Sequence, residues 1–230
     1  SGPCRSRKPM ALELIDVNLG VAGRALVRGL GARVEPGEVL ALMGPSGSGK
    51  SSLLAWIAGT LEPPFEAQGT LRLDGRDISH EPVQRRRIGL LFQDDLLFPH
   101  MTVRENLLFA LPAGARAERE SAVAAALVEA GLPGHEQRLP ASLSGGQRAR
   151  VSLLRCLLAQ PRALLLDEPF SRLDATLRAQ IREFTFATLR ARGVPAVLVT
   201  HDAADVPPGA ACVLLGAPAD PTHPAQAGHA

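Results

Sequence analysis

The 230-residue sequence has no tyrosine, one tryptophan, three cysteines and only two lysines. The cysteines, Cys4, Cys156 and Cys212, are odd in number and far apart, which excludes a disulfide framework and a CxxC metal site. No apolar run approaches the roughly 18 residues that a membrane-spanning helix needs. The segment 1–9 lacks the apolar stretch of a signal peptide. We therefore expect a reduced, cytosolic protein.

The charges are nearly balanced, with a net charge of +2. Such a balance provides no broad basic field, so we expect no nucleic-acid partner. All the cationic residues are arginines except Lys8 and Lys50. A lysine retained in such a chain indicates chemistry that a planar guanidinium cannot perform.

Short apolar runs and helical patterns alternate along the chain, which predicts an α/β fold. The expected strands are 12–19, 26–34, 39–43, 70–73, 88–92, 163–166 and 196–200. Helices are expected over 51–58 and over 174–192, the second beginning at Asp174 and ending at Gly193. Residues 103–160 are rich in Ala, Leu, Glu and Arg, and predict a helical block inserted between strands.

A glycine-rich segment follows the expected strand 39–43 and opens the expected helix. Its residues, GPSGSGKS, fit the pattern GxxxxGK[ST] in the strand–loop–helix setting that a phosphate-binding loop requires. The loop amides would surround phosphate oxygens, Lys50 would reach the β- and γ-phosphates, and Ser51 would offer its hydroxyl to Mg²⁺. The predicted nucleotide-binding residues here are Gly44, Pro45, Ser46, Gly47, Ser48, Gly49, Lys50, Ser51 and Ser52.

Two acidic residues, Asp167 and Glu168, follow the apolar run 163–166. Ligands of open α/β sheets bind beyond the carboxyl ends of strands, so these carboxylates are expected at the same site. Asp167 would hold Mg²⁺ directly or through water, and Glu168 would orient and polarise the attacking water.

A second glycine motif, LSGGQ, opens another expected helix. Ser144 is the expected cap of that helix, and Gly145, Gly146 and Gln147 follow it with exposed amides. The segment is therefore a second candidate anion site, which suggests that the phosphates are gripped from two sides.

These motifs together resemble those of the ATP-binding subunits of ABC transporters over about residues 10–205. In order, they are the Walker A loop, a Q-loop glutamine at Gln93, the signature at 143–147, Walker B at 164–167 with Glu168, a D-loop at 171–174 and a switch histidine at His201. The stretches 85–93 and 98–107 resemble the bacterial importers of the thiamine, sulfate, iron and polyamine branch.

The resemblance implies a P-loop NTPase (RecA-like) core with an N-terminal antiparallel β portion and an inserted α-helical subdomain. It implies a homodimer in which each ATP lies between the Walker A loop of one subunit and Ser144–Gln147 of the other. Gln93 would contact Mg²⁺, His201 would sense the γ-phosphate, and Lys50, Gln93, Glu168 and His201 would be the catalytic residues.

The implied partners are integral-membrane permease subunits and, indirectly, a periplasmic or extracellular binding protein. The protein would then lie in the cytoplasm, on the inner face of the cell membrane. An exporter cassette and a soluble ABC ATPase without a permease are the alternatives. The soluble types need a long coiled coil or two cassettes, and the stretch 98–107 argues against an exporter.

A single ATPase domain is expected over 10–215, with the helical subdomain at about 94–160. Residues 1–9 are expected to be an upstream extension or a non-native remnant, and residues 216–230 a disordered tail rich in Pro, Ala, Gly and His.

Two features depart from the family pattern. No aromatic residue precedes Trp56, so the usual ring that stacks on adenine is missing, and Val21 occupies the expected position. Arg172 replaces a small residue in the D-loop. The run Arg85–Arg87, in the stretch that resembles the importers, is expected to be a solvated face, with contact to the permease as the alternative.

Overall fold

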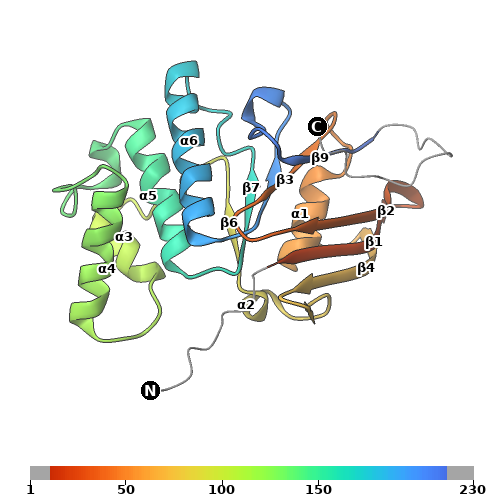
Figure 1. Ribbon diagram of the computed structural model, residues 1–230, viewed down its shortest axis with the longest axis horizontal. Helices are drawn as coiled ribbons and strands as arrows, with labels where there is room; N and C mark the ends of the chain where they lie inside the picture. Colours follow the sequence, from red (N-terminus) through yellow and green to blue (C-terminus); the bar gives the residue numbers. More distant parts are fainter. Residues whose placement is uncertain (1–10, 217–230) are drawn as a thin grey trace.

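The structure is a computed structural model that describes residues 11–216. The predictions for 1–9 and 217–230 lie outside the described residues. Two sheets form the framework (Figure 1). The antiparallel sheet has the order β2-β1-β4-β5 and contains β1 (Leu12–Val21), β2 (Arg24–Val34), β4 (Phe65–Leu73) and β5 (Arg76–Asp77). The parallel sheet has the order β6-β7-β8-β3-β9 and contains β3 (Val39–Met43), β6 (Ile88–Leu91), β7 (Ala163–Asp167), β8 (Ala196–Val199) and β9 (Ala211–Leu214).

Six α-helices connect these strands within residues 11–216. They are α1 (Lys50–Ala58), α2 (Val83–Arg86), α3 (Val103–Ala110), α4 (Arg116–Glu129), α5 (Gly145–Leu158) and α6 (Ala175–Arg192). Short 3₁₀ turns occupy Pro140–Ser142 and Ala203–Asp205. The α/β prediction is confirmed, and α6 has the predicted ends, because the Asp174 side chain accepts from the Leu177 amide and Gly193 adopts a left-handed φ of 62°.

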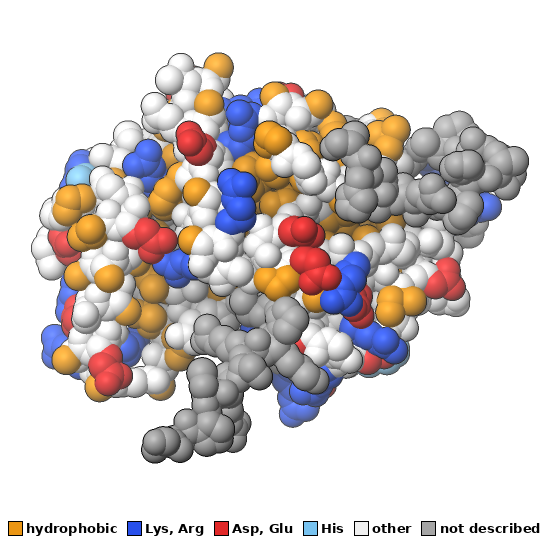
Figure 2. All heavy atoms as spheres, viewed as in Figure 1, with side chains coloured by type: hydrophobic (Ala, Val, Ile, Leu, Met, Phe, Trp, Pro, Cys, Tyr) orange, Lys and Arg blue, Asp and Glu red, His pale blue; other side chains and the backbone are white. Residues whose placement is uncertain are grey.

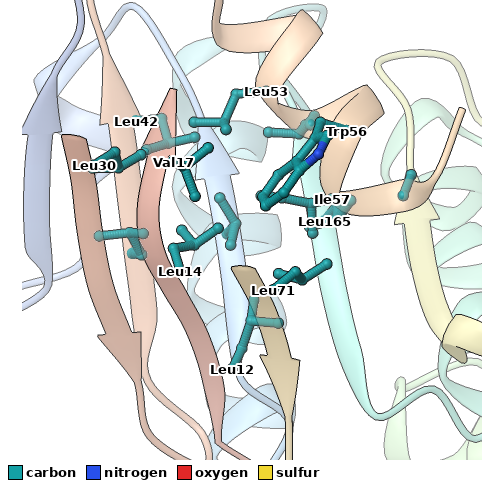
Figure 3. Packing of buried hydrophobic residues seen from close by; sticks show 14 of the residues in the cluster. Leu12, Leu14, Val17, Leu30, Leu42, Leu53, Trp56, Ile57, Leu71 and Leu165 are labelled. Atoms are coloured by element: carbon teal, nitrogen blue, oxygen red, sulfur yellow. The ribbon is translucent and has the colours of Figure 1, made fainter. Parts of the chain in front are cut away.

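The central strands β3, β7 and β8 are almost wholly apolar because both faces of the parallel sheet are covered. Helix α1 packs against strands of both sheets (Figure 3). Its Leu53, Trp56 and Ile57 lie among Leu12 and Leu14 of β1 and the central strands. This packing fixes the start of α1, and with it the glycine-rich loop, against the sheet.

Helices α3, α4 and α5 gather at the end of the molecule away from the antiparallel sheet (Figure 1). They share a hydrophobic core of their own, which includes Val103, Leu107, Leu127 and Leu154. A capping box joins Thr102 and Glu105 at the start of α3. The helical block expected over 103–160 is therefore present as helices, while its status as a subdomain at 94–160 stays a prediction.

Arg86 corrects the prediction that the run Arg85–Arg87 is a solvated face. Its neighbours are exposed, but Arg86 is buried at 6% relative exposure. The guanidinium donates to the carbonyls of Trp56 (2.6 Å), Ile57 (2.9 Å), Ser79 (2.7 Å) and Glu81 (2.8 Å). The first two belong to the last turn of α1, where the Trp56 carbonyl also accepts from the Gly59 amide at 3.1 Å. Arg86 therefore adds a charged donor to the carbonyls at that helix end.

Two further elements differ from the sequence predictions. Strand β9 was not predicted, although it pairs in parallel with β3. Strand β4 begins at Phe65 rather than at Thr70, because its first half pairs with the end of β1. The first half of β4 mixes polar and apolar residues, so it lacks the apolar run of a buried strand. Strand β9 is a short apolar run of four residues at the edge of the parallel sheet, where its side chains alternate between partly buried and exposed.

The surface carries charges of both signs interspersed with apolar atoms over the face drawn in Figure 2. This mixture agrees with the small net charge. Over residues 11–216, no helix combines the length and the apolar character needed to cross a bilayer.

Candidate active site

The glycine-rich loop joins β3 to α1, as predicted, and three of its glycines have positive φ angles. These are Gly44 (142°), Gly47 (77°) and Gly49 (95°). At Gly44 a side chain is excluded by space as well as by φ, because a Cβ would lie 2.3 Å from the Leu215 carbonyl oxygen. The end of β9 thus packs directly on the first residue of the loop.

Lys50 is the first residue of α1 and is buried at 8% relative exposure. Its ammonium donates to the carbonyl oxygens of Gly44 (2.7 Å) and Pro45 (2.9 Å). An ammonium has three donors. The lysine therefore ties the loop together and retains a third N–H for a ligand.

Four parallel strands bring the remaining predicted residues to one edge of the sheet. Gln93 follows β6, Asp167 and Glu168 end β7, and His201 follows β8, while β3 leads into the loop. A pocket of about 320 Å³ is lined by Ser51, Phe92, Gln93, Asp94, Asp167 and Glu168. All three predicted metal ligands, Ser51, Gln93 and Asp167, line this pocket.

Asp167 is a residue of the pocket whose pKa is shifted. Burial raises the pKa of its carboxyl, and the neighbouring charge of Glu168 raises it further, while Lys50 acts in the opposite direction. A half-buried carboxylate beside a second one attracts a cation. Hydroxyl, amide and carboxylate oxygens are ligands that Mg²⁺ accepts, so the residues present fit this ion.

Glu168 is held in an unusual backbone conformation, with a φ of 47°. Its amide donates to the Val199 carbonyl at 3.0 Å, and its carbonyl accepts from the Ser171 hydroxyl at 2.8 Å. Oε1 of Glu168 lies 3.2 Å from Nδ1 of His201. Two residues predicted from separate strands therefore touch.

Residues that the sequence did not single out hold the segment around His201. Arg178 on α6 donates to Asp205 with both Nε (2.7 Å) and Nη2 (2.6 Å). Asp205 is buried at 2% relative exposure and also accepts from the Thr200 hydroxyl at 2.8 Å. A short polar run between apolar strands gives no signal that one of its acids is buried.

The signature segment forms the start of α5, as predicted. The Ser144 hydroxyl accepts from the Gln147 amide at 3.3 Å, and the Gln147 side chain accepts from the Ser144 amide at 3.0 Å. Gly146 packs against α6, because a Cβ there would lie 2.4 Å from Cδ1 of Leu177. None of the residues 144–147 lines the pocket that contains Asp167 and Glu168.

The end of the β1–β2 hairpin lies over the loop: a Cβ on Gly49 would lie 3.0 Å from Cβ of Leu26 and 3.5 Å from Cδ2 of Leu19. Val21 at this end pairs with Arg24 on one side and with Phe65 on the other. Residues directly opposite in antiparallel strands share a face. An aromatic residue therefore stands beside Val21, although it comes from a distant part of the sequence.

Comparisons with known proteins agree with this geometry. The ABC transporter family matches residues 27–171. The chain is 50% identical over 193 residues to the uncharacterized ABC transporter ATP-binding protein YnjD of Escherichia coli (strain K12), covering 84% of this chain and 89% of that protein.

Two importer subunits are also similar. The Fe(3+) ions import ATP-binding protein FbpC 2 of Rhodococcus jostii (strain RHA1) is 42% identical over 195 residues, covering 84% of this chain and 55% of that protein. The sulfate/thiosulfate import ATP-binding protein CysA of Mycobacterium tuberculosis (strain ATCC 25618 / H37Rv) is 46% identical over 174 residues, covering 75% of this chain and 49% of that protein. The chain thus spans about half the length of these two importer proteins.

Among solved structures, cbiO1 from Clostridium perfringens, part of the ABC transporter complex cbiONQ, has a TM-score of 0.78 and 27% identity. The match covers 89% of this chain and 84% of that one. The order of motifs, the pocket that unites them and these relatives lead to one conclusion. The chain belongs to the ABC transporter family, as one of its ATP-binding subunits.

Proposed function

We propose that this protein hydrolyses ATP to power a membrane transporter that imports a solute. The pocket that joins Ser51, Gln93, Asp167 and Glu168 beside the Lys50 loop is the observation that carries this proposal. The names of the iron, sulfate and thiosulfate relatives favour import over export.

Each residue has a definite task in this proposal. The loop amides of 44–49 and the Lys50 ammonium bind the β- and γ-phosphates. Ser51, Gln93 and Asp167 would hold Mg²⁺, which supplies charge neutralisation on those phosphates. Glu168 orients and polarises the attacking water, and His201 positions the Glu168 carboxylate through the contact between them.

The signature segment acts in this proposal on the ATP of a second copy. Residues 144–147 do not line the pocket of their own chain, while the start of α5 presents helix amides that suit an anion. Two copies arranged head to tail would close each ATP between the loop of one and Ser144–Gln147 of the other. Permease subunits would attach to this dimer at the cytoplasmic face of the membrane, and a binding protein would deliver the solute.

Two variants test the ATPase. We expect Lys50→Ala to lose both ATP binding and hydrolysis, because it removes the ammonium and two loop contacts. Glu168→Gln keeps the shape of the side chain, so ATP should still bind and hold the dimer while hydrolysis stops. Size-exclusion chromatography with ATP and Mg²⁺, beside a phosphate-release assay, measures both effects, and Glu66→Gln is a control at an exposed carboxylate. A Glu168→Gln protein that stays monomeric with ATP would contradict the two-copy site.

Membrane attachment needs a separate measurement. The protein should pellet with vesicles only when its permease subunits are present in them. Pelleting without the permease, or failure to pellet with it, would contradict the transport role.

A further inference from the structure

Arg172, which departs from the family pattern, forms an ion pair with Asp94. The two residues are 78 positions apart in the sequence. Arg172 comes four residues after Glu168, and Asp94 directly follows Gln93. Strands β6 and β7, which precede these segments, are parallel neighbours with Leu91 opposite Leu166. The pair therefore links the two loops that leave adjacent strands at the edge of the catalytic pocket.

The residues Phe92, Gln93 and Asp94 lie between two anchored positions, Leu91 in β6 and Asp95 beside α5. Helix α5 holds the residues that follow: the Ser152 hydroxyl donates to the Asp95 carbonyl at 2.8 Å, and Arg155 donates to the Leu96 carbonyl at 2.7 Å. Arg148 also donates to the Asp95 carboxylate at 3.1 Å. Within residues 11–216, the Gln93 side chain has no hydrogen bond, and that of Asp94 bonds to Arg172 alone.

The position of the Arg172–Asp94 ion pair favours an effect on the pocket and not on the stability of the fold. Both side chains are more than half exposed, at 60% for Arg172 and 54% for Asp94. Exposed ion pairs add little to the stability of a folded protein, because water and salt screen them. Asp94 nevertheless lines the pocket together with Gln93, Asp167 and Glu168.

The charge of the pocket also depends on this pair. Three of its six lining residues are acidic, namely Asp94, Asp167 and Glu168, and none is a cation. An uncompensated carboxylate at Asp94 would repel a triphosphate, whereas Asp167 and Glu168 are needed for the metal and the water. Arg172 is the cation that offsets Asp94.

We propose that Arg172 is a positioning residue, which holds Gln93 at the catalytic pocket by its ion pair with Asp94. The inference rests on the proposed ATPase function and adds to it. Removing either partner frees the 92–94 segment, so Gln93 spends less time where it meets the metal and the γ-phosphate. Small displacements of such groups cost large factors in rate.

The kinetic test uses Asp94→Asn, Arg172→Ala, the double variant and the exchange Asp94→Arg with Arg172→Asp. Asp94→Asn should lower kcat about tenfold with KM for ATP unchanged. Arg172→Ala should lower kcat equally and raise KM, because Asp94 is left uncompensated. The double variant should have the same kcat as Asp94→Asn, because both variants lose the same single ion pair. The charge-exchanged variant, Asp94→Arg with Arg172→Asp, should recover most of kcat. Arg76→Ala, which breaks another exposed ion pair, is the control.

A second readout needs no catalysis. Amide hydrogen exchange of the peptide containing residues 92–97 should become several-fold faster in Asp94→Asn and Arg172→Ala, with an unchanged melting temperature. If the wild-type protein does not hydrolyse ATP, the ATPase proposal is refuted, but the hydrogen-exchange comparison can still be made. Unchanged exchange in both variants, kcat within twofold of wild type, or losses that multiply in the double variant would overturn the positioning role.

Discussion

Nδ1 of His201 lies 3.2 Å from Oε1 of Glu168, so a ring that follows β8 contacts the carboxylate that follows β7. Because the proposed mechanism assigns this contact to the attacking water and not to the phosphate loop, we expect His201→Ala to lower kcat at least tenfold with little change in the Kd for ATP. Steady-state hydrolysis and equilibrium ATP titration measure the two quantities. Equal losses in kcat and affinity would show that His201 serves binding instead.

The two-copy site predicts complementation between inactive subunits. Ser144→Arg spoils the signature and Lys50→Ala spoils the phosphate loop, so neither protein should hydrolyse ATP alone. A heterodimer contains one intact pair of loop and signature, and the mixture should recover ATPase activity above the sum of its parts. Affinity pull-down of differently tagged chains would show whether heterodimers form. If they form and the mixture recovers no activity, the signature works within one chain.

Arg86 should be far more important for stability than either neighbouring arginine. Arg86→Ala leaves four carbonyls, two of them in buried hydrogen bonds, without their charged donor, and should cost about 3 kcal/mol of unfolding free energy. Arg86→Lys should lose most of this as well, because a single ammonium cannot reach all four oxygens. Arg85→Ala, at an exposed position, should stay within about 0.5 kcal/mol of wild type in urea denaturation. Equal effects at the two positions would contradict the role assigned to Arg86.

Asp167 should destabilise the fold at neutral pH. Its pKa is raised in the folded protein above the ordinary value of 3.8, first by burial and then by Glu168. The folded state therefore holds the proton more tightly than the unfolded state, and stability falls as pH rises through this range. Asp167→Asn should raise the melting temperature at pH 7, with a gain that shrinks toward pH 4, while abolishing hydrolysis. A gain that grew on acidification would refute this assignment.

Nucleotide selectivity should be weak, because β1 lacks the ring expected at Val21. Base stacking is worth about 1–3 kcal/mol, so we expect similar Kd values for ATP and GTP. Val21→Tyr should tighten ATP binding by about tenfold with kcat unchanged, since stacking is equal in ground and transition states. Tight and strongly ATP-selective binding by the wild type would contradict this prediction. Phe65→Ala tests whether the ring beside Val21 stacks on the base instead. If this variant loses affinity for ATP but keeps its affinity for inorganic triphosphate, Phe65 contacts the base.

The chemistry of the site could be predicted from sequence because its motifs are local. The loop at 44–51, the acids at 167–168 and the cap at Ser144 each depend on residues a few positions apart, and the order of the parallel strands brings the loop and the acids together. The role of Arg172 could not be predicted, because its partner Asp94 lies on another strand connection. The same holds for Phe65 beside Val21 and for Arg178 with the buried Asp205, since pairing across strands and helices leaves no local pattern.

Burial of Arg86 was missed for a different reason. Three consecutive arginines read as a solvated face by composition alone. Arg86 is the last residue of α2 and its guanidinium reaches the end of α1, while Arg85 and Arg87 stay exposed. A pattern of charges does not reveal which member of a run binds the carbonyls at a helix end.

The contact between Gly44 and Leu215 has a consequence for the order of events during synthesis. The first residue of the phosphate loop is shaped against a carbonyl that the ribosome adds 171 positions later. The loop, its helix and the strands around it can fold earlier, but Gly44 lacks its contact with the Leu215 backbone until β9 has emerged and paired with β3. We expect a nascent chain that is extended by a linker, so that residues up to 210 have left the exit tunnel while 211–216 are still inside it, to bind nucleotide poorly, even though every motif residue through His201 has emerged.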